Sequence, residues 1–323
     1  MDKRAAKVCE MYNKFPFPSI RGNYDSFFRT CVFPALQELG RKGAMKRILD
    51  AGCGTGNLTV EIARNFPDAE VVGIDFTDKS LEVASGKINS LGLKNVKLQK
   101  SDLLEFSPEL GKFDFIACSG VIHHLSDPLK GLVNLNKYLK EECYAFIWVY
   151  LILGKRNILE MKEVLEILGV DELPWEKKVR LCSDARVHFE KHGRLNRIIN
   201  LLKRIEKHGF KGFQRYLLHR FRLSTEKIPV GGFHEDILLA DQLLHPLEKF
   251  YRFSEVIDEF NQSGFKFIKI LEGMSDSLEK SFGNNGLASL AVKNLSEMDI
   301  YRLIELKEKP TGVGCLVKKT TNL

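Results

Sequence analysis

The sequence lacks the features of several protein classes. Its seven cysteines are scattered and form no CxxC pair. Several lie inside apolar runs, which indicates small core residues in a reducing compartment. No apolar run approaches the ~18 residues that a membrane-spanning helix needs. The charged start, MDKRAAKVCEMYNKF, has no apolar core typical of a signal peptide. Internal repeats and low-complexity tracts are also absent. We therefore expect a globular, cytoplasmic protein.

Positive charge is concentrated in one segment. The 323 residues carry a net charge of +7, yet residues 176–222 alone hold fourteen Lys and Arg against four Asp and Glu. This local excess of ten exceeds the total, so the rest of the chain is net negative. Such an uneven distribution bears on binding partners and not on the fold.

Strand-like and helix-like segments alternate between residues 46 and 152. Helical spacing and β-branched content distinguish the two kinds. Asp127 and Pro128 are typical of a helix start, as N-cap and first helical residue. This alternation predicts a parallel sheet with helices on both faces. The expected strands are RILDAG, EVVGIDF, VKLQKSDL, FDFIACS and CYAFIWVYL, and the expected helices are LTVEIARNF, SLEVASGKINSLG and DPLKGLVNLNKYLK.

The remaining chain divides into three further parts. Residues 153–249 break the rhythm with amphipathic patterns such as RNILEMKEVLEILGV, which predict a helical insertion. Residues 250–323 resume the alternation, with RFSEVIDEFNQSGF as a helix, FKFIKILEG as a strand, a helical stretch and a last strand, GVGCLVKK. Residues 1–45 are expected to form an N-terminal helical segment.

The stretch LDAGCGTGN joins the first expected strand to its helix through three glycines. Glycine at such a joint indicates a close approach of the backbone to a neighbour. The spacing is GxGxG and not the GxGxxG of dinucleotide sites. Asp75 and Asp102 follow the second and third strands, where carboxylates could accept hydrogen bonds from a ribose and an adenine. Phe76 and Leu103 come one residue later, suitably placed to sandwich an adenine ring.

These motifs together resemble the class I S-adenosylmethionine-dependent methyltransferases, over residues 46–150. The resemblance implies a Rossmann-like, seven-stranded sheet whose last strand, GVGCLVKK, is antiparallel. It also implies S-adenosyl-L-methionine as cofactor and S-adenosyl-L-homocysteine as product. By this resemblance Asp75 holds the ribose and Asp102 the adenine, with Ser119 also near the cofactor. The loop that approaches the methionine part of the cofactor carries Asp50, Gly52, Gly54 and Gly56.

The N-terminal stretch MYNKFPFPSIRGNYDSFF is aromatic and stiffened by two prolines. Its YNKFPFPSI segment resembles the Y-x-x-x-P-[YF]-P segment of a poorly characterised group of bacterial methyltransferases. Tyr12 and Arg21 could reach the cofactor or the acceptor, as parts of a lid that excludes water. A helix that merely covers the sheet edge is the alternative.

The end of the fourth strand, CSGVIHHLSDP, bears on the methyl acceptor. Amino-group methylases usually carry Asn/Asp-Pro-Pro-Tyr at this place, and RNA cytosine enzymes use a cysteine pair, whereas Cys118 stands alone. The VIHHL segment instead resembles quinone, sterol and other small-molecule methyltransferases. His123 and His124 point in different directions because they are adjacent. One could act as a base, and both could be structural.

A third histidine follows in GGFHEDILLADQLLHP. On a continuous helix His234, Asp241 and His245 would share one face. Two histidines and a carboxylate can bind a metal, but an acceptor pocket or an ordinary surface fits equally, so we assign no metal and take His245 as a candidate catalytic residue.

Three functions are compatible with the sequence. The first is a methyltransferase with a small organic acceptor, and the second is an RNA methyltransferase whose basic residues 176–222 bind phosphates. A non-catalytic nucleoside-binding protein is the third. Sequence alone fixes neither the methylated atom nor the oligomeric state.

Overall fold

A computed structural model describes residues 3–18, 27–40, 45–182, 233–283 and 295–320. The chain divides into two compact units. The first, called the core unit below, is Met1–Asn157 with His245–Leu323, and the second is Ile158–Leu244. Among the described helices, none combines the length and apolar character that crossing a membrane requires.

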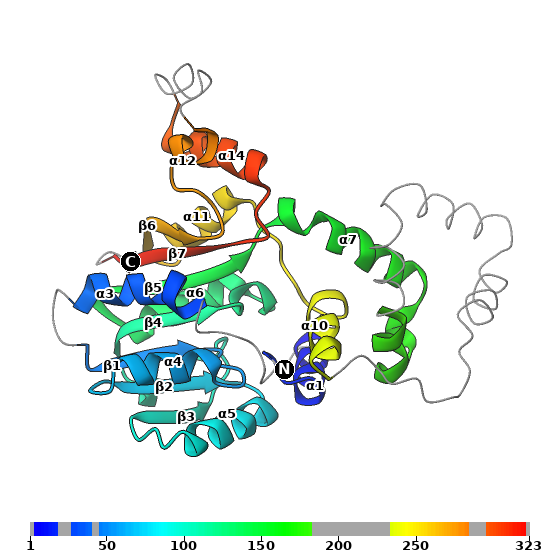
Figure 1. The fold of residues 1–323 in the computed structure, drawn as a ribbon, viewed down its shortest axis with the longest axis horizontal. Coiled ribbons are helices and arrows are strands. Elements are labelled where there is room, and N and C mark those ends of the chain that lie inside the picture. The colour runs from blue at the N-terminus through cyan, green and yellow to red at the C-terminus, as the bar shows by residue number, and fades with distance from the viewer. Residues whose placement is uncertain (1–2, 19–26, 41–44, 183–232, 284–294, 321–323) are drawn as a thin grey trace, which may run out of the picture. The chain divides into compact units, whose positions relative to one another are not determined.

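Seven strands of the core unit form one mixed sheet in the order β3-β2-β1-β4-β5-β7-β6 (Figure 1). The pairs among β1 to β5 are parallel, whereas β7 runs antiparallel to both β5 and β6. The predicted sheet with an antiparallel last strand is therefore confirmed. The strands are β1 (Arg47–Ala51), β2 (Glu70–Asp75), β3 (Val96–Lys100), β4 (Phe113–Ser119), β5 (Leu139–Tyr150), β6 (Phe265–Glu272) and β7 (Gly312–Lys319).

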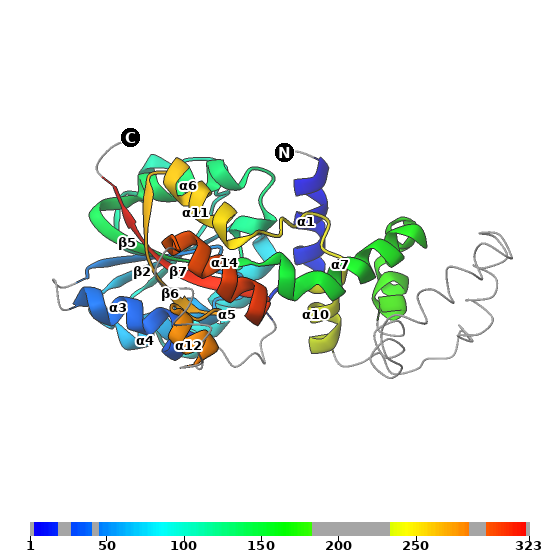
Figure 2. The same ribbon diagram turned by 90° about the horizontal axis from the view of Figure 1, so that it is seen from above.

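Helices cover both faces of the sheet (Figure 2). One apolar core lies between the sheet and α6, α11, α12 and α14, and a second lies between the sheet and η1, α3 and α4. The α-helices are α1 (Lys3–Lys14), α3 (Phe33–Gly40), α4 (Asn57–Asn65), α5 (Asp78–Ser90), α6 (Pro128–Tyr138), α7 (Ile152–Ile167), α10 (Phe233–Leu243), α11 (Phe253–Gln262), α12 (Leu278–Phe282) and α14 (Glu297–Glu308). Shorter turns are the π-helical η1 (Phe28–Val32) and the 3-10 helices η2 (Pro108–Leu110), η3 (Ile122–His124) and η4 (Val170–Glu172), and residues 175–182 are also helical.

Helix α6 shows how local sequence sets an element's limits. The Asp127 side chain accepts a hydrogen bond from the Lys130 backbone N–H at 2.9 Å, and Pro128 is the first helical residue, as predicted. The following strand, β5, begins at Leu139, earlier than expected. Its pairing with β4 contains a register shift, and Glu142 near the shift has a φ of 61°. An irregularity of this kind hides the start of a strand from its hydrophobic pattern.

The strand register places the ends of β1, β2 and β3 at one edge of the sheet. Ala51 pairs with Ile74, and Asp75 pairs with Lys100, so the residues that follow these strands lie next to one another. Ligands of open parallel sheets bind beyond the carboxyl ends of the strands. This edge is therefore where a functional site is expected.

Candidate functional site

The loop Asp50–Gly56, called the glycine loop below, connects β1 to α4. Its Gly52, Gly54 and Gly56 have φ angles of 75°, 51° and 78°, in the left-handed region that favours glycine. The backbone N–H groups of Gly52 and Cys53 both donate to the Ile74 carbonyl at 2.8 Å, which ties the loop to β2. The backbone conformation of the loop therefore requires glycine at these three positions.

Close protein neighbours surround all three glycines. A Cβ on Gly52 would lie 2.3 Å from the Val121 Cγ2, in the segment after β4. A Cβ on Gly54 would lie 2.3 Å from the carbonyl oxygen of Phe17. The third glycine faces Ala84 of α5, whose Cβ would be 2.9 Å away. The glycine loop thus makes room for the N-terminal segment and for the chain after β4, at the edge where a ligand would bind.

The N-terminal segment is hydrogen-bonded directly to the glycine loop. The Thr55 N–H donates to the Phe17 carbonyl at 3.2 Å, and the Thr55 hydroxyl donates to the Pro18 carbonyl at 2.6 Å. Upstream, the Asn13 side chain of α1 accepts from the Lys79 N–H at 3.4 Å. These bonds involve backbone carbonyls and a threonine that no sequence motif singles out. Residues 12–18 therefore lie over the carboxyl edge of the sheet.

Asp50 lies in the interior of the core unit. It is 2% exposed, and its Oδ2 accepts a hydrogen bond from the Thr59 hydroxyl at 2.5 Å. Burial raises its pKa to about 7, opposed by the Thr59 hydrogen bond and assisted by the charge of Asp75. In this position Asp50 fixes the start of the glycine loop and of α4.

Asp75 ends β2 and binds the glycine loop from the other side. Its Oδ2 accepts from the Gly54 N–H at 3.0 Å, and its Oδ1 accepts from the N–H and the hydroxyl of Thr77 at 2.9 and 2.7 Å. Burial raises the pKa of this carboxyl. Oδ2 retains acceptor capacity, since an ionised carboxylate offers about two lone-pair sites on each oxygen and Oδ1 already accepts two hydrogen bonds. Phe76, the next residue, is half-buried.

Asp102 and Leu103 follow β3. The Asp102 Oδ1 accepts from the Leu104 N–H at 2.9 Å, which closes a turn and leaves the second oxygen for other partners. Leu103 is 5% exposed and belongs to the apolar core, so its side chain packs inward in this structure. At the end of β4, Ser119 is half-buried and pairs in register with Trp148 of β5.

His123 is completely buried in an aromatic environment. Its ring centroid lies 4.0 Å from that of Tyr150, 4.2 Å from that of His124 and 6.0 Å from that of Trp148. Neither ring nitrogen has a hydrogen-bond partner among the residues that the structure describes. Burial holds the pKa of His123 well below its usual range, with smaller contributions from His124 and Lys155. This side chain is therefore a neutral packing group with no access to solvent.

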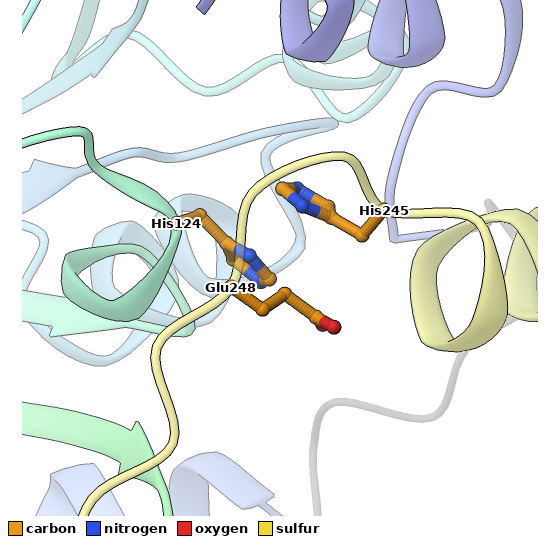
Figure 3. A group of neighbouring side chains, drawn as sticks. All are labelled: His124, His245 and Glu248. Carbon is orange, nitrogen blue, oxygen red and sulfur yellow. The ribbon is translucent and has the colours of Figure 1, made fainter. Parts of the chain in front are cut away.

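His124 and His245 form a stacked pair (Figure 3). Their ring centroids are 3.8 Å apart with an interplanar angle of 29°. Both rings are largely buried, at 8% and 5% exposed, and the ring of Tyr12 from α1 lies edge-on to His245 at 5.5 Å. The pair thus contacts the N-terminal segment through Tyr12 and joins the turn after β4, which carries His124, to the segment after α10, which carries His245.

The backbone of one residue, Leu247, contacts both rings of this pair. The Nδ1 of His124 lies 3.2 Å from the Leu247 carbonyl oxygen, and the Leu247 N–H donates to the Nδ1 of His245 at 3.2 Å. Glu248 completes the group, because a nitrogen of each ring and a carboxylate oxygen all lie within 4.8 Å of one another. In Figure 3 the three side chains extend from η3 and from the segment after α10.

This group has the composition of a metal site but not its geometry. Two histidines that share an ion must direct in-plane lone pairs at one point, whereas stacked rings direct them side by side. The Nδ1 lone pair of His245 is moreover engaged by the Leu247 N–H. The arrangement therefore suits hydrogen bonding and proton transfer better than metal coordination.

The expected helix through His245 ends too early for the predicted shared face. Helix α10 stops at Leu243, and His245 precedes Pro246. A residue before proline avoids the helical region, which explains the difference. Asp241 is buried within α10, and the side chain of His234 is not among those described. Arg21 lies outside the described residues, as does most of the basic segment 176–222.

Sequence reasoning missed several groups near these histidines. Lys155 of α7 is 6% exposed, and its ammonium lies 3.7 Å from the centroid of Tyr150. Leu247 acts through its backbone, which leaves no signal in the sequence. Glu248 follows the HP dipeptide closely, and a carboxylate two residues after a proline could have been noted as a neighbour of His245.

Known proteins give an independent view of the chain. Residues 42–164 match a family model described as a methyltransferase domain. An uncharacterized protein of Synechococcus is 28% identical over 319 residues, which cover 94% of this chain and 69% of that protein. The demethylmenaquinone methyltransferase of Staphylococcus aureus is 36% identical over 107 residues, 32% of this chain and 43% of the enzyme.

A solved structure supports the fold. PKMT2 from Rickettsia typhi, determined in complex with AdoHcy, has a TM-score of 0.60 at 17% identity, over 90% of this chain and 53% of its own. The chain thus spans about half the length of that protein. The matched domain coincides with β1 to β5 and with the glycine loop. By this match residues 42–164, somewhat over a third of the chain, are a methyltransferase domain.

Proposed function

We propose that the protein transfers the methyl group of S-adenosylmethionine to a small organic acceptor at the carboxyl edge of the sheet. The observation that carries this proposal is the hydrogen bond between the glycine loop and Asp75 within a methyltransferase domain, beside the segment after β4 that carries His124. Methyl transfer is an in-line displacement at carbon, so much of its rate comes from positioning donor and acceptor.

The cofactor would lie across the ends of β1, β2 and β3. Asp75 would accept a hydrogen bond from a ribose hydroxyl on Oδ2, with the lone pair that Gly54 leaves available. Asp102 would use its second oxygen for the adenine amino group. The glycine loop would face the methionine part, and Phe76 is exposed enough to contact the adenine ring.

The N-terminal segment would close over the bound cofactor. Support comes from Thr55, which donates two hydrogen bonds to residues 17–18, and from the contact of Tyr12 with His245. This segment thus touches both the glycine loop and the histidines. Exclusion of water from a methyl-transfer site is the benefit that such a cover provides.

The acceptor is proposed to be small because of the residues that come after β4. His123 and His124 occupy the place where amino-group methylases carry Asn/Asp-Pro-Pro-Tyr. Cys118 is fully buried in β4, and burial raises the pKa of its thiol. Because the thiolate is the nucleophilic form, this cysteine is unsuited to the role that cysteine has in RNA cytosine methylation. The positive charge of residues 176–222 favours RNA as the second candidate.

Calorimetric titration with S-adenosylmethionine and S-adenosylhomocysteine tests the cofactor site. We expect micromolar binding that Asp75→Ala abolishes. Asp78→Ala is the matched control, because this exposed carboxylate three residues away pairs only with Lys100 among the salt bridges of the described residues. Absence of binding in the wild-type protein would refute the proposal. Transfer of labelled methyl to bulk RNA, with strong salt dependence, would replace the small acceptor by RNA.

A further inference from the structure

The backbone N–H and carbonyl of Leu247 determine which nitrogen of each stacked ring carries a proton. A carbonyl oxygen can only accept, so the His124 Nδ1 within 3.2 Å of it must be the donor. A backbone N–H can only donate, so the His245 Nδ1 that receives the Leu247 N–H must be unprotonated. The same residue therefore imposes opposite tautomers on the two neutral rings.

The opposite tautomers give the two Nε2 atoms complementary roles. In neutral His124 the proton is on Nδ1, and Nε2 has a lone pair that can take a proton. In neutral His245 the Nε2 has the proton and can donate a hydrogen bond. Within an imidazole the two nitrogens point in nearly opposite directions, so both Nε2 atoms are directed away from Leu247. Because the rings are stacked at 3.8 Å, a base and a donor lie side by side.

From this arrangement we infer that His124 is the general base, that His245 donates a hydrogen bond to the acceptor, and that the acceptor is a hydroxyl flanked by a second oxygen. This inference rests on the proposed function. An enol or phenol beside a carbonyl or hydroxyl group offers one proton to His124 and one oxygen lone pair to His245. A single isolated hydroxyl would satisfy only one of the two rings.

The reaction balances with the residues present. The hydroxyl proton moves to the Nε2 of His124, and the oxygen lone pair forms the new bond to the methyl carbon. The carbon–sulfur bond of the donor breaks, and its electron pair stays on sulfur, which becomes the neutral thioether of S-adenosylhomocysteine. His124 is left as an imidazolium. The carboxylate of Glu248, within 4.8 Å, stabilises this charge.

The groups around the pair are consistent with this division of roles. His124 faces Tyr150 at a ring-centroid distance of 5.7 Å, and His245 faces Tyr12 at 5.5 Å. His123, 4.2 Å from His124, is neutral because of its burial. Glu248 is thus the carboxylate that lies beside both rings of the pair.

Long-range ¹H–¹⁵N NMR of the histidine rings tests the inference on the full chain with S-adenosylhomocysteine bound. We expect the Nδ1–H tautomer for His124 and the Nε2–H tautomer for His245 at a pH where both are neutral. The signals are assigned with His124→Gln and His245→Gln, or with the Asn variants where a Gln variant does not fold. The same tautomer at both rings would overturn the inference.

Catechol serves as the probe of the acceptor class, with phenol as the control that lacks the second oxygen. Catechol should shift the Nε2 signals of both His124 and His245, phenol should shift His124 more than His245, and the enclosed His123 should respond to neither. Equal responses to catechol and phenol would overturn the flanking-oxygen requirement. Zinc binding that His245→Gln abolishes would instead identify a metal centre and would also overturn the inference.

Failure of this inference can be distinguished from failure of the proposed function. Calorimetric affinity for S-adenosylhomocysteine should stay within about twofold in both Gln variants, since neither ring contacts the glycine loop in the described hydrogen bonds. Loss of this affinity in the wild-type protein refutes the cofactor site. If the affinity is retained but both rings have the same tautomer, only the assignment of roles to the two histidines is refuted.

Discussion

The contact between Gly54 and the N-terminal segment predicts a measurable loss of stability in Gly54→Ala. At a φ of 51° an L-residue costs about 1–2 kcal/mol relative to glycine. The new Cβ would also lie 2.3 Å from the Phe17 carbonyl oxygen, so residues 17–18 must move. That movement breaks two hydrogen bonds from Thr55, worth about 1 kcal/mol each. We expect a total loss of roughly 3–4 kcal/mol.

Urea unfolding monitored by circular dichroism measures this loss, and Gly92→Ala supplies the matched control. Gly92 has a similar φ of 64°, but nothing lies within 4 Å of the position of its Cβ. The control should therefore lose only the backbone contribution, about 1–2 kcal/mol. Equal losses in the two variants would refute the close approach of Phe17 to the glycine loop.

Three further predictions concern buried polar groups. Because burial raises the Asp50 pKa from 3.8 to about 7, its neutral form stabilises the fold at low pH. Up to about 4 kcal/mol is lost as the pH rises from 3.8 to about 7. The unfolding free energy of Asp50→Asn relative to wild type should therefore increase over this range and level off above it; a constant difference would contradict this. Thr55→Val removes the hydrogen bond to the Pro18 carbonyl at similar side-chain volume. It should lower the free energy of unfolding in urea by about 1 kcal/mol. An unchanged free energy of unfolding would show that this bond contributes nothing to stability. Arg252 pairs at 3.2 Å with Glu305, whose side chain is 2% exposed. Arg252→Ala removes this counter-charge and should destabilise the fold by roughly 1–3 kcal/mol, seen as a lower thermal midpoint. An unchanged midpoint would mean that Glu305 needs no counter-charge.

Much of the fold could be predicted because its signals are local. The strands β4 and β7 have the predicted limits, since each is a short apolar run between turn residues. Asp75 and Asp102 could be placed at one edge because parallel strands bring their carboxyl ends together. These features depend on periodicity and on sequence order, which the chain displays directly.

The contacts that shape the site could not be predicted, because they join distant backbone groups. Thr55 donates to the carbonyls of residues 17 and 18, and the backbone of Leu247 binds both His124 and His245. No side-chain pattern records such partners. The face that His234, Asp241 and His245 would share on a continuous helix does not form, because α10 ends at Leu243 and the residue before Pro246 leaves the helix.

The place of β7 between β5 and β6 has a consequence for synthesis of the chain. Strand β6 is made first, yet in the described sheet its neighbour is β7, which follows some 40 residues later. Until β7 emerges, β5 presents an open edge and β6 has nothing to pair with. Unpaired edges promote association between nascent chains. A ribosome that stalls between these strands would therefore release a molecule with a formed glycine loop but an aggregation-prone sheet.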